Sequence, residues 1–533
     1  MEAKTTETWR AVTITLESAR AYENPFLDVE IWARFTGPSG QVIRREAYWD
    51  GGTTYRVSFA PTEAGSWTYV VEAPAETGLS ELTGTLEAVA YSGDLPIYQH
   101  GFLRVSADGR YLEYADGTPF FWLGDTHWEF AYGESWDESN HPGMASQFRG
   151  MVDLRVAQGF NVYQTNLRSD MGTGPDNYWE RTKDGGWLPN VAFYQDELDR
   201  RMRYIADAGL VNALGQSWCF ALLGEGRAEL QIQFARYLVA RYGALPMVWT
   251  LAGEVAGYDS SVRDRLIAGW RKVALEIERR DGYGQLQTAH YTNERPFASY
   301  YQDEEWFDFT LNQAGHGDYL ITAADYQQFF DEHPGKPFVE GEALYEFCST
   351  LEEMGTRLCT ADMLRRVAYL SVQLGGCGYT YGAQGIWDNV WDKPERPSGF
   401  LAIFNRFGVT WSEAVDGEGA VQMGHLREFY EHAGFSDLAP VELEVDRGNL
   451  FAKKRPLVTA SKEFSRIVAY YCDTARKTLS LDCVPEGSRY EARWFDPREG
   501  VYADAGVVEC PDGVLELPAK PGLDDWLLLL ERS

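Results

Sequence analysis

Strand-like and helix-like segments alternate along most of this chain, and this alternation limits its fold more than any other feature. Eight short apolar runs with strand character are separated by amphipathic stretches with helical spacing. The runs cover residues 120–125, 160–166, 210–218, 246–254, 285–292, 307–316, 336–344 and 375–385. Eight strand–helix units within roughly 300 residues predict a (β/α)8 TIM barrel, here over residues 91–440.

An open, doubly wound sheet is the alternative architecture for the same alternation. Sheets of that kind often bind nucleotides through a glycine-rich loop that follows a strand. The chain has neither a GxGxxG motif after a predicted strand nor a Walker loop. We therefore expect the closed barrel, and nucleotide binding has no support.

The two ends of the chain have the period-two alternation of β-strands. In the first 90 residues, Val12, Ile14 and Leu16 alternate with polar residues, and turn-forming segments follow at short intervals. Residues 467–472 and 490–495 have the same character near the other end. These patterns predict an antiparallel β-sandwich over residues 1–90 and a second one over residues 441–533.

Two of the predicted barrel strands carry the dipeptide Gly-Glu near their ends. The fourth run ends in Gly253 and Glu254, and the seventh contains Gly341 and Glu342. A buried carboxylate is costly unless it has a partner or a task. Barrel enzymes place their catalytic groups at the carboxyl ends of the strands, and glycoside hydrolysis needs two carboxylates. Glu254 and Glu342 are therefore the candidate catalytic pair, with Glu340 as the rival of Glu342 because side chains two apart on a strand share a face.

Further polar and aromatic residues lie at the ends of the other predicted strands. Each of them alone has a structural explanation, since His290 fits a core histidine and Asp125 fits a cap of the following helix. As a set they predict a substrate-binding site at one end of the barrel. Its candidate members are Asp125, Asn166, Arg168, Trp218, His290, Gln313, His316, Tyr381, Gln384 and Trp387.

The composition excludes several classes of partner. A net charge of −32 repels phosphate backbones and anionic membranes, so we expect no nucleic-acid partner. The chain has no run of 18 apolar residues and no apolar segment of the kind that secretory signals carry, so we expect no membrane span and a cytoplasmic location. The 7 cysteines have no CxxC spacing, and we expect neither a metal nor another cofactor. A homo-oligomer is compatible with the sequence.

Several longer motifs resemble one family. The segment HGFLRV at 100–105, followed by DGTPFFWLGDT at 116–126, resembles the start of the barrel in the apiosidase-like glycoside hydrolases (family 140). QTAH at 287–290, QAGH at 313–316 and GYTYGAQGIW at 378–387 are similar to its later motifs. NPF at 24–26 and WDGG at 49–52 resemble the β-domain that often precedes such barrels, and WFDPREG at 494–500 resembles the one that follows.

The resemblance covers nearly the whole chain and implies a TIM barrel that acts on glycosidic bonds, with carboxylates on strands 4 and 7. The chain departs from the family pattern at strand 4, where Glu254 stands in place of an Asp. A Glu carboxylate reaches about one methylene further, so the sugar and linkage are left open, and a furanoside such as an apioside is one candidate.

The residues and the resemblance together give a mechanistic hypothesis. The enzyme cleaves a small neutral oligosaccharide or glycoside with retention, Glu342 attacking the anomeric carbon and Glu254 serving as acid and then base. Two alternatives remain at this stage. A non-catalytic carbohydrate-binding barrel predicts that one carboxylate lies away from the site, and a metal-dependent barrel hydrolase would use Asp125, His290 and His316.

In this hypothesis the other residues bind the sugar. His290, Tyr381 and Gln384 are expected to bond the nucleophile and sugar hydroxyls. The terminal sugar is expected to contact Asp125, Asn166 and Arg168, with Trp218 or Trp387 stacked on it.

Overall fold

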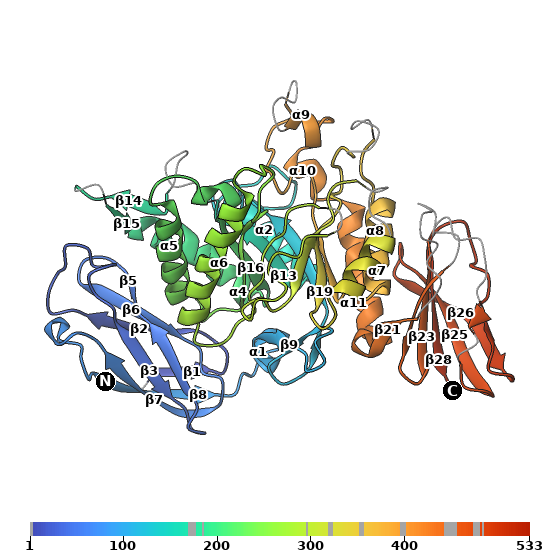
Figure 1. The fold of residues 1–533 in the computed structure, drawn as a ribbon, viewed down its shortest axis with the longest axis horizontal. Coiled ribbons are helices and arrows are strands. Elements are labelled where there is room, and N and C mark those ends of the chain that lie inside the picture. The colour runs from blue at the N-terminus through green and yellow to red at the C-terminus, as the bar shows by residue number, and fades with distance from the viewer. Residues whose placement is uncertain are drawn as a thin grey trace.

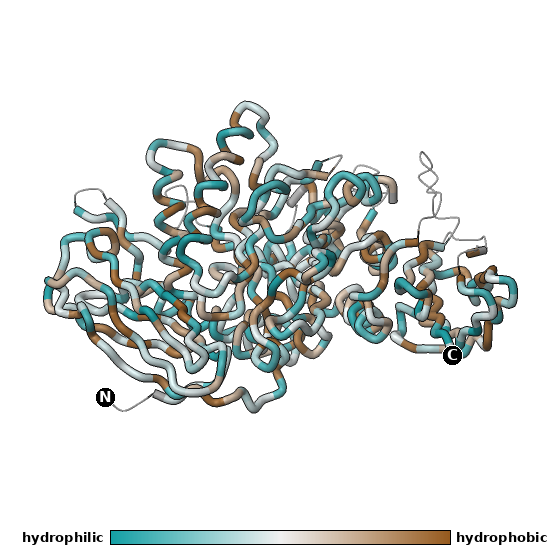
Figure 2. The backbone as a smooth tube through the Cα atoms, turned by 60° about the horizontal axis from the view of Figure 1, so that its bottom comes forward, coloured by the Kyte–Doolittle hydropathy of each residue, from teal (hydrophilic) through white to brown (hydrophobic). Residues whose placement is uncertain are grey.

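The computed structural model describes residues 4–168, 177–183, 186–294, 297–317, 323–350, 357–394, 401–441, 456–472, 480–481 and 484–533. The chain forms three regions in the order of the sequence, with an α/β region between two β-rich ends (Figure 1). The predicted multidomain organisation is therefore present. Hydrophilic and hydrophobic residues alternate over short distances along the backbone (Figure 2). Among the residues described, no helix is long and apolar enough to cross a lipid bilayer.

The central region contains a curled sheet of seven strands, all paired in parallel. The order across the sheet is β17-β16-β13-β12-β20-β19-β18. Seven of the eight predicted runs overlap these strands. They are β12 (Trp122–His127), β13 (Val162–Asn166), β16 (Val211–Trp218), β17 (Met247–Gly253), β18 (Thr310–Gln313), β19 (Phe338–Glu342) and β20 (Gly378–Tyr381).

The remaining run, residues 285–292, is not a regular strand, which differs from the prediction. It lies between the two edge strands and makes one parallel bridge to each, Gln287 to Trp249 of β17 and His290 to Leu311 of β18. Some backbone groups that a regular strand would pair with its neighbour form hydrogen bonds with side chains instead. The Thr288 hydroxyl, for example, donates to the carbonyl of Phe309 at 2.5 Å.

The sheet is covered by helices, which explains why its strands are buried on both faces. Every residue of β12, β13 and β17 is buried, as expected for parallel strands between two layers. Figure 1 shows helices packed around the sheet. They include α2 (Gln147–Ala157), α4 (Asp199–Asp207), α5 (Arg227–Tyr242), α6 (Arg263–Arg280), α7 (Ala323–Glu332), α8 (Ala361–Gln373) and α11 (Glu418–Ala433).

The N-terminal region consists of two sheets, with orders β1-β8-β7-β3-β4 and β2-β6-β5. The apolar alternation of β2 places Ile14 and Leu16 in the core. One pairing differs from the antiparallel prediction, because β1 runs parallel to β8. The strands are β1 (Lys4–Glu7), β2 (Val12–Glu17), β3 (Trp32–Thr36), β4 (Val42–Glu46), β5 (Tyr48–Trp49), β6 (Thr54–Phe59), β7 (Gly65–Glu72) and β8 (Thr83–Val89).

A short connecting segment follows, with α1 (Pro96–His100) and a small sheet of β9 (Leu103–Val105), β10 (Leu112–Tyr114) and β11 (Pro119–Phe120). The C-terminal region has an antiparallel sheet of order β21-β22-β23-β28-β25-β26 and a two-stranded sheet of β24 and β27. These strands are β21 (Leu438–Pro440), β22 (Leu457–Ser461), β23 (Arg466–Tyr471), β24 (Ser480–Leu481), β25 (Ser488–Asp496), β26 (Val501–Cys510), β27 (Leu515–Glu516) and β28 (Trp526–Arg532).

Buried ion pairs attach both β-rich regions to the central one. Arg280 of α6 donates to Glu46 of β4 at 2.7 Å. On the other side, Arg365 of α8 forms two bonds to Asp525, at 3.0 and 2.8 Å. Removing one partner of a buried ion pair destabilises a protein by about 3–5 kcal/mol. These contacts therefore fix the flanking regions against the central one.

Candidate active site

Both Gly-Glu dipeptides lie where a strand ends, and in both the glycine makes room for a neighbour. A Cβ atom on Gly253 would lie 2.3 Å from the ring of Trp218, and one on Gly341 would lie 2.5 Å from Leu311. Glu254 adopts a left-handed backbone conformation, with φ of 53°. Such strain is common at functional sites, where the surrounding structure holds it.

Three side-chain nitrogen atoms lie within hydrogen-bond distance of the carboxylate of Glu342. Gln313 donates from Nε2 to Oε1 at 2.9 Å, and Nε2 of His316 lies 3.1 Å from the same oxygen. Nε2 of His290 lies 3.0 Å from Oε2. The backbone N–H of Glu254 donates to Nδ1 of His290 at 3.4 Å, which leaves the imidazole proton on the nitrogen that faces Glu342.

Glu254 shares one of these partners. Its Oε1 accepts from Tyr258 at 2.7 Å and from Nε2 of Gln313 at 3.2 Å. Gln313 therefore donates to both carboxylates, which brings the ends of β17 and β19 together in one site.

The two carboxyl groups have opposite pKa shifts. Burial raises the pKa of Glu254, and the charge of Glu342 raises it further. Burial also raises the pKa of Glu342, but the imidazoles of His290 and His316 outweigh it and hold the pKa well below its usual range. The site thus favours a proton on Glu254 and a negative charge on Glu342.

Aromatic rings form the walls around this pair. Trp128 makes edge contacts with Trp218 and His290, at centroid distances of 5.8 and 5.5 Å. Tyr345 lies 4.7 Å from the ring of His316 and 5.9 Å from that of Trp387. The structure therefore places Trp218, His290, Gln313, His316 and Trp387 together with the carboxylates.

Asp125 is not part of this group, contrary to the prediction. Its carboxylate is fully buried and contacts Arg155 of α2 at 2.5 Å and His127 at 2.7 Å. Tyr381 is the register partner of Asp125 on the next strand, and its hydroxyl donates to Glu346 at 2.6 Å. Both side chains point toward the helices and away from Glu342. The side of the sheet that was predicted for these residues is therefore wrong, as a shift of one residue along each strand would make it.

Three other predicted residues bond to protein groups near the strand ends. Asn166 donates to the carbonyl of Ser217 at 2.8 Å and accepts from the N–H of Arg168 at 2.7 Å. Arg168 forms an ion pair with Glu129. Gln384 accepts from the indole of Trp387 at 3.2 Å and donates to Asp388 at 2.5 Å, so it orients a wall residue of the site.

Glu340, the rival nucleophile, is fully buried on the helix side of β19. It accepts from Tyr326 of α7 at 2.7 Å, from Asn312 at 2.8 Å and from the N–H of Ala314 at 3.0 Å. The register between β18 and β19 shifts after Asn312. Glu342 therefore does not point to the same side of the sheet as Glu340, although the two are two residues apart.

Sequence reasoning missed Trp128, Tyr345 and Tyr258, although each follows a candidate residue closely. Trp128 donates from Nε1 to the hydroxyl of Tyr345 at 3.1 Å, and Tyr258 follows Glu254 by four residues. Aromatic residues just beyond the strand ends were the available signal, because such positions enter the loops at the carboxyl ends of the strands.

The cluster of Asp125, His127 and Glu134 makes stability depend on pH. Burial lowers the pKa of His127, but the charges of Glu134 and Asp125 outweigh it and raise the pKa from 6.5 to about 9. The stabilisation from this histidine is therefore complete below pH ~6.5 and is lost as the pH rises through about 9. We expect the free energy of unfolding to fall by about 3 kcal/mol between these pH values.

Urea unfolding at pH 6.5 and pH 9 measures this effect. The His127→Asn variant carries no titrating group at this position and should lose much less stability over the same interval. An equal loss in both proteins would show that another group causes it.

The proposed metal site of Asp125, His290 and His316 is not assembled, because Asp125 contacts Arg155 while the two histidines contact Glu342. Within the described ranges, no group of three or more His, Cys, Asp or Glu side chains is placed to hold a metal ion.

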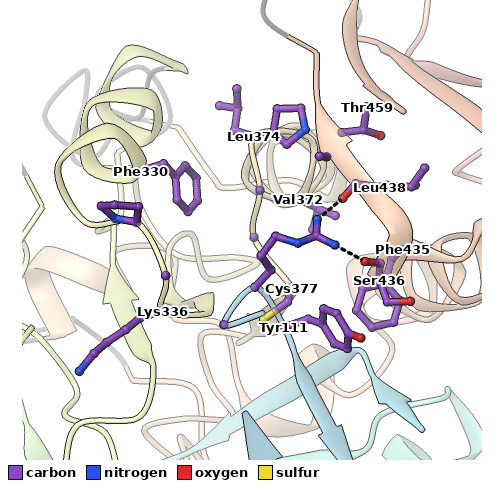
Figure 3. A pocket seen from close by; sticks show the side chains of 18 of the residues that line it. Tyr111, Phe330, Lys336, Val372, Leu374, Cys377, Phe435, Ser436, Leu438 and Thr459 are labelled. Carbon is purple, nitrogen blue, oxygen red and sulfur yellow. Dashed lines mark hydrogen bonds between the residues drawn. The ribbon is translucent and has the colours of Figure 1, made fainter. Parts of the chain in front are cut away.

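A cavity of about 240 Å³ lies away from this site, beside the C-terminal region (Figure 3). Lys336 and Cys377 line it just before β19 and β20 begin, so it is at the opposite end of the sheet from Glu342.

The fold is similar to that of several solved structures. A candidate glycoside hydrolase from Bacteroides vulgatus ATCC 8482 matches with a TM-score of 0.71 and 16% identity, over 99% of this chain and 100% of that one. A glycoside hydrolase family 5 structure from the same organism has a TM-score of 0.65 and 21% identity, over 83% of this chain and 94% of the other. A third structure, described as a glycoside hydrolase, has a TM-score of 0.65 and 23% identity, over 83% and 99%.

Curated proteins contain no match to this chain. Family models match two of its regions. A domain of unknown function (DUF5060) matches residues 5–74, and the catalytic domain described as apiosidase-like matches residues 106–437. The latter match spans more than half of the chain, includes both Glu254 and Glu342 and confirms the resemblance of the sequence motifs. The chain belongs to the apiosidase-like family.

Proposed function

We propose that this protein is a retaining glycoside hydrolase in which Glu342 is the nucleophile and Glu254 is the acid and base. The proposal includes a (β/α)8 barrel in which residues 285–292 take the place of the remaining strand between β17 and β18. The two bridges of this segment support that closure. Family membership supports the reaction class.

The observation that carries the mechanism is the shared donor. Nε2 of Gln313 donates to Oε1 of Glu254 at 3.2 Å and to Oε1 of Glu342 at 2.9 Å. Two Oε1 atoms that accept from one nitrogen at these distances lie closer together than the about 6.5–9.5 Å by which inverting enzymes separate their carboxyl groups to admit water. The spacing favours the short separation, about 5–5.5 Å, of retaining enzymes.

The opposite pKa shifts suit the two roles. A proton on Glu254 is needed when the glycosidic oxygen leaves, and a charged Glu342 is needed for attack. In the first step, an oxygen of Glu342 forms a bond to the anomeric carbon while Glu254 protonates the departing oxygen. In the second step, Glu254 takes a proton from water, the water oxygen attacks the same carbon, and the bond to Glu342 breaks.

We propose a small neutral oligosaccharide or glycoside as the substrate, with a furanoside such as an apioside as one candidate. The walls of the site carry Trp128, Trp218, Tyr345 and Trp387, and aromatic rings bind the apolar faces of sugars. A net charge of −32 disfavours a polyanionic substrate. The non-catalytic alternative requires that the carboxylates lie apart, whereas both bond to Gln313.

A panel of nitrophenyl glycopyranosides and glycofuranosides tests the proposal. We expect release of nitrophenol from at least one of them by the wild-type protein and none above background by the folded Glu254→Gln/Glu342→Gln double variant. The same assay is repeated with oligosaccharides, whose cleavage is measured by chromatography. If the wild-type protein and the double variant show equal rates of hydrolysis on every substrate, the hydrolase assignment is refuted.

A further inference from the structure

Tyr258 combines two properties that rarely occur together. Its side chain is among the most exposed large rings of the protein, with 64% of the residue accessible. Its hydroxyl nevertheless donates to Oε1 of Glu254 at 2.7 Å. The ring therefore lies at the solvent side of the proposed acid and base, with its polar end directed into the site.

The loop between these residues is shaped to make this contact. Gly257 donates its N–H to the carbonyl of Glu254 at 2.7 Å and has φ of +60°. A Cβ atom on Gly257 would also lie 3.1 Å from Leu266 and 3.3 Å from Cys219. A tight turn that requires glycine thus returns the chain so that Tyr258 meets Glu254.

The donors around Glu254 distinguish its two oxygens. Tyr258 and Gln313 both donate to Oε1, at 2.7 and 3.2 Å. No side chain among the residues described donates to Oε2. A carboxylic acid keeps its proton away from an oxygen that already accepts two hydrogen bonds, so the acidic proton belongs on Oε2.

We propose that Tyr258 is a positioning residue that fixes the acidic proton of Glu254 on Oε2, and that its ring forms the subsite for a leaving group with a flat apolar face. This inference rests on the proposed function. The proton on Oε2 passes to the glycosidic oxygen as the bond between that oxygen and the anomeric carbon breaks. The oxygen keeps the bonding electron pair, and the alcohol departs past the ring of Tyr258.

Several groups besides Tyr258 act on the charge of Glu254. They are Glu342 from β19, His290 from residues 285–292 and Gln313 from β18, and the thiol of Cys219 lies close enough to respond to the charge of Glu254. Tyr258 donates to Oε1 at a shorter distance than Gln313 does, 2.7 against 3.2 Å. Its hydrogen bond favours the charged carboxylate, so its removal should raise the pKa of Glu254.

The Tyr258→Phe variant removes the hydroxyl and keeps the ring. We expect the basic limb of the pH profile of kcat/KM to move up by about one pH unit. We also expect kcat/KM to fall about tenfold for sugar and alkyl leaving groups, which need the proton, and by less than about twofold for nitrophenol, which does not. Tyr258→Ala also removes the ring and should raise KM several-fold. Whether KM rises for sugar leaving groups, for phenols or for both identifies the kind of leaving group that binds to the ring of Tyr258.

Tyr204→Phe is the matched control, because Tyr204 donates to Asp153 at 2.9 Å on the helical surface. It should leave both readouts unchanged. A Tyr258→Phe enzyme with an unmoved basic limb, or with an equal loss for all leaving groups, would overturn the inference. Glu254→Gln is measured on the same substrates. If that variant keeps wild-type activity, the proposed function itself fails, whereas its loss beside an unaffected Tyr258→Phe enzyme rejects the inference alone.

Discussion

Replacing Glu342 by alanine should lower kcat/KM by about 10⁴-fold or more, because the substitution removes the group that forms the covalent intermediate. Azide should restore turnover, since a small anion fits into the space that the carboxylate leaves. The product is then a glycosyl azide with the configuration opposite to that of the substrate. Enzyme kinetics with and without azide, and NMR of the product, measure both effects.

Glu340→Gln is the control for this experiment. Glu340 lies two residues earlier on β19 and contacts Tyr326, Asn312 and Ala314 instead of the site. The Glu340→Gln substitution should lower the free energy of unfolding, while the kcat of the folded enzyme stays within a few-fold of wild type. If Glu340→Gln removes activity and Glu342→Ala does not, the nucleophile has been misassigned.

Replacing Glu254 by alanine should have an effect that depends on the leaving group. General acid catalysis contributes about 10²–10⁴-fold, so kcat/KM for a sugar leaving group should fall by that amount. For a dinitrophenyl leaving group, which departs without a proton, the loss should be less than about tenfold. Hydrolysis of the intermediate still lacks its base, so kcat falls with both substrates.

Azide distinguishes the two variants. In Glu254→Ala the anion attacks the covalent intermediate from the opposite face, so its product has the configuration of the substrate. An inverted azide product from this variant, or equal losses for both leaving groups, would contradict the assignment of Glu254 as acid and base.

The fold was largely predictable because its signal is repeated. Seven of the predicted runs overlap strands of the parallel sheet, since strands that are buried along their whole length carry many apolar residues. Residues 285–292 have the same composition but not the regular pairing. Hydrogen bonds such as that from Thr288 to Phe309 join segments distant enough in sequence that no local pattern reveals them.

The site was predictable only in part, and the facing of strands explains the difference. Gly-Glu at two strand ends pointed to Glu254 and Glu342, and the ends of neighbouring strands pointed to His290, Gln313 and His316, which the structure places around these carboxylates. In β12 and β20 every residue is buried, so hydropathy does not tell the concave side of the curled sheet from the side that faces the helices. Asp125 and Tyr381 were assigned to the wrong side for that reason.

Tyr258 could not be found from the sequence because its role depends on a loop conformation. The turn at Gly257 returns it to Glu254, and a turn of this kind has no distinctive pattern beyond a single glycine. Gln313 was a candidate from the sequence, but its bonds to both carboxylates could not be foreseen, because they form where β18 shifts register beside β19.

The configuration of the first product tests the central claim most directly. Proton NMR spectra recorded during hydrolysis of a defined glycoside by the wild-type enzyme show which anomer forms before mutarotation. Two carboxylates bonded to the same amide nitrogen predict that the anomer of the substrate appears first and then equilibrates. If the opposite anomer appears first, Glu342 activates water instead of attacking the sugar, and the covalent mechanism is wrong.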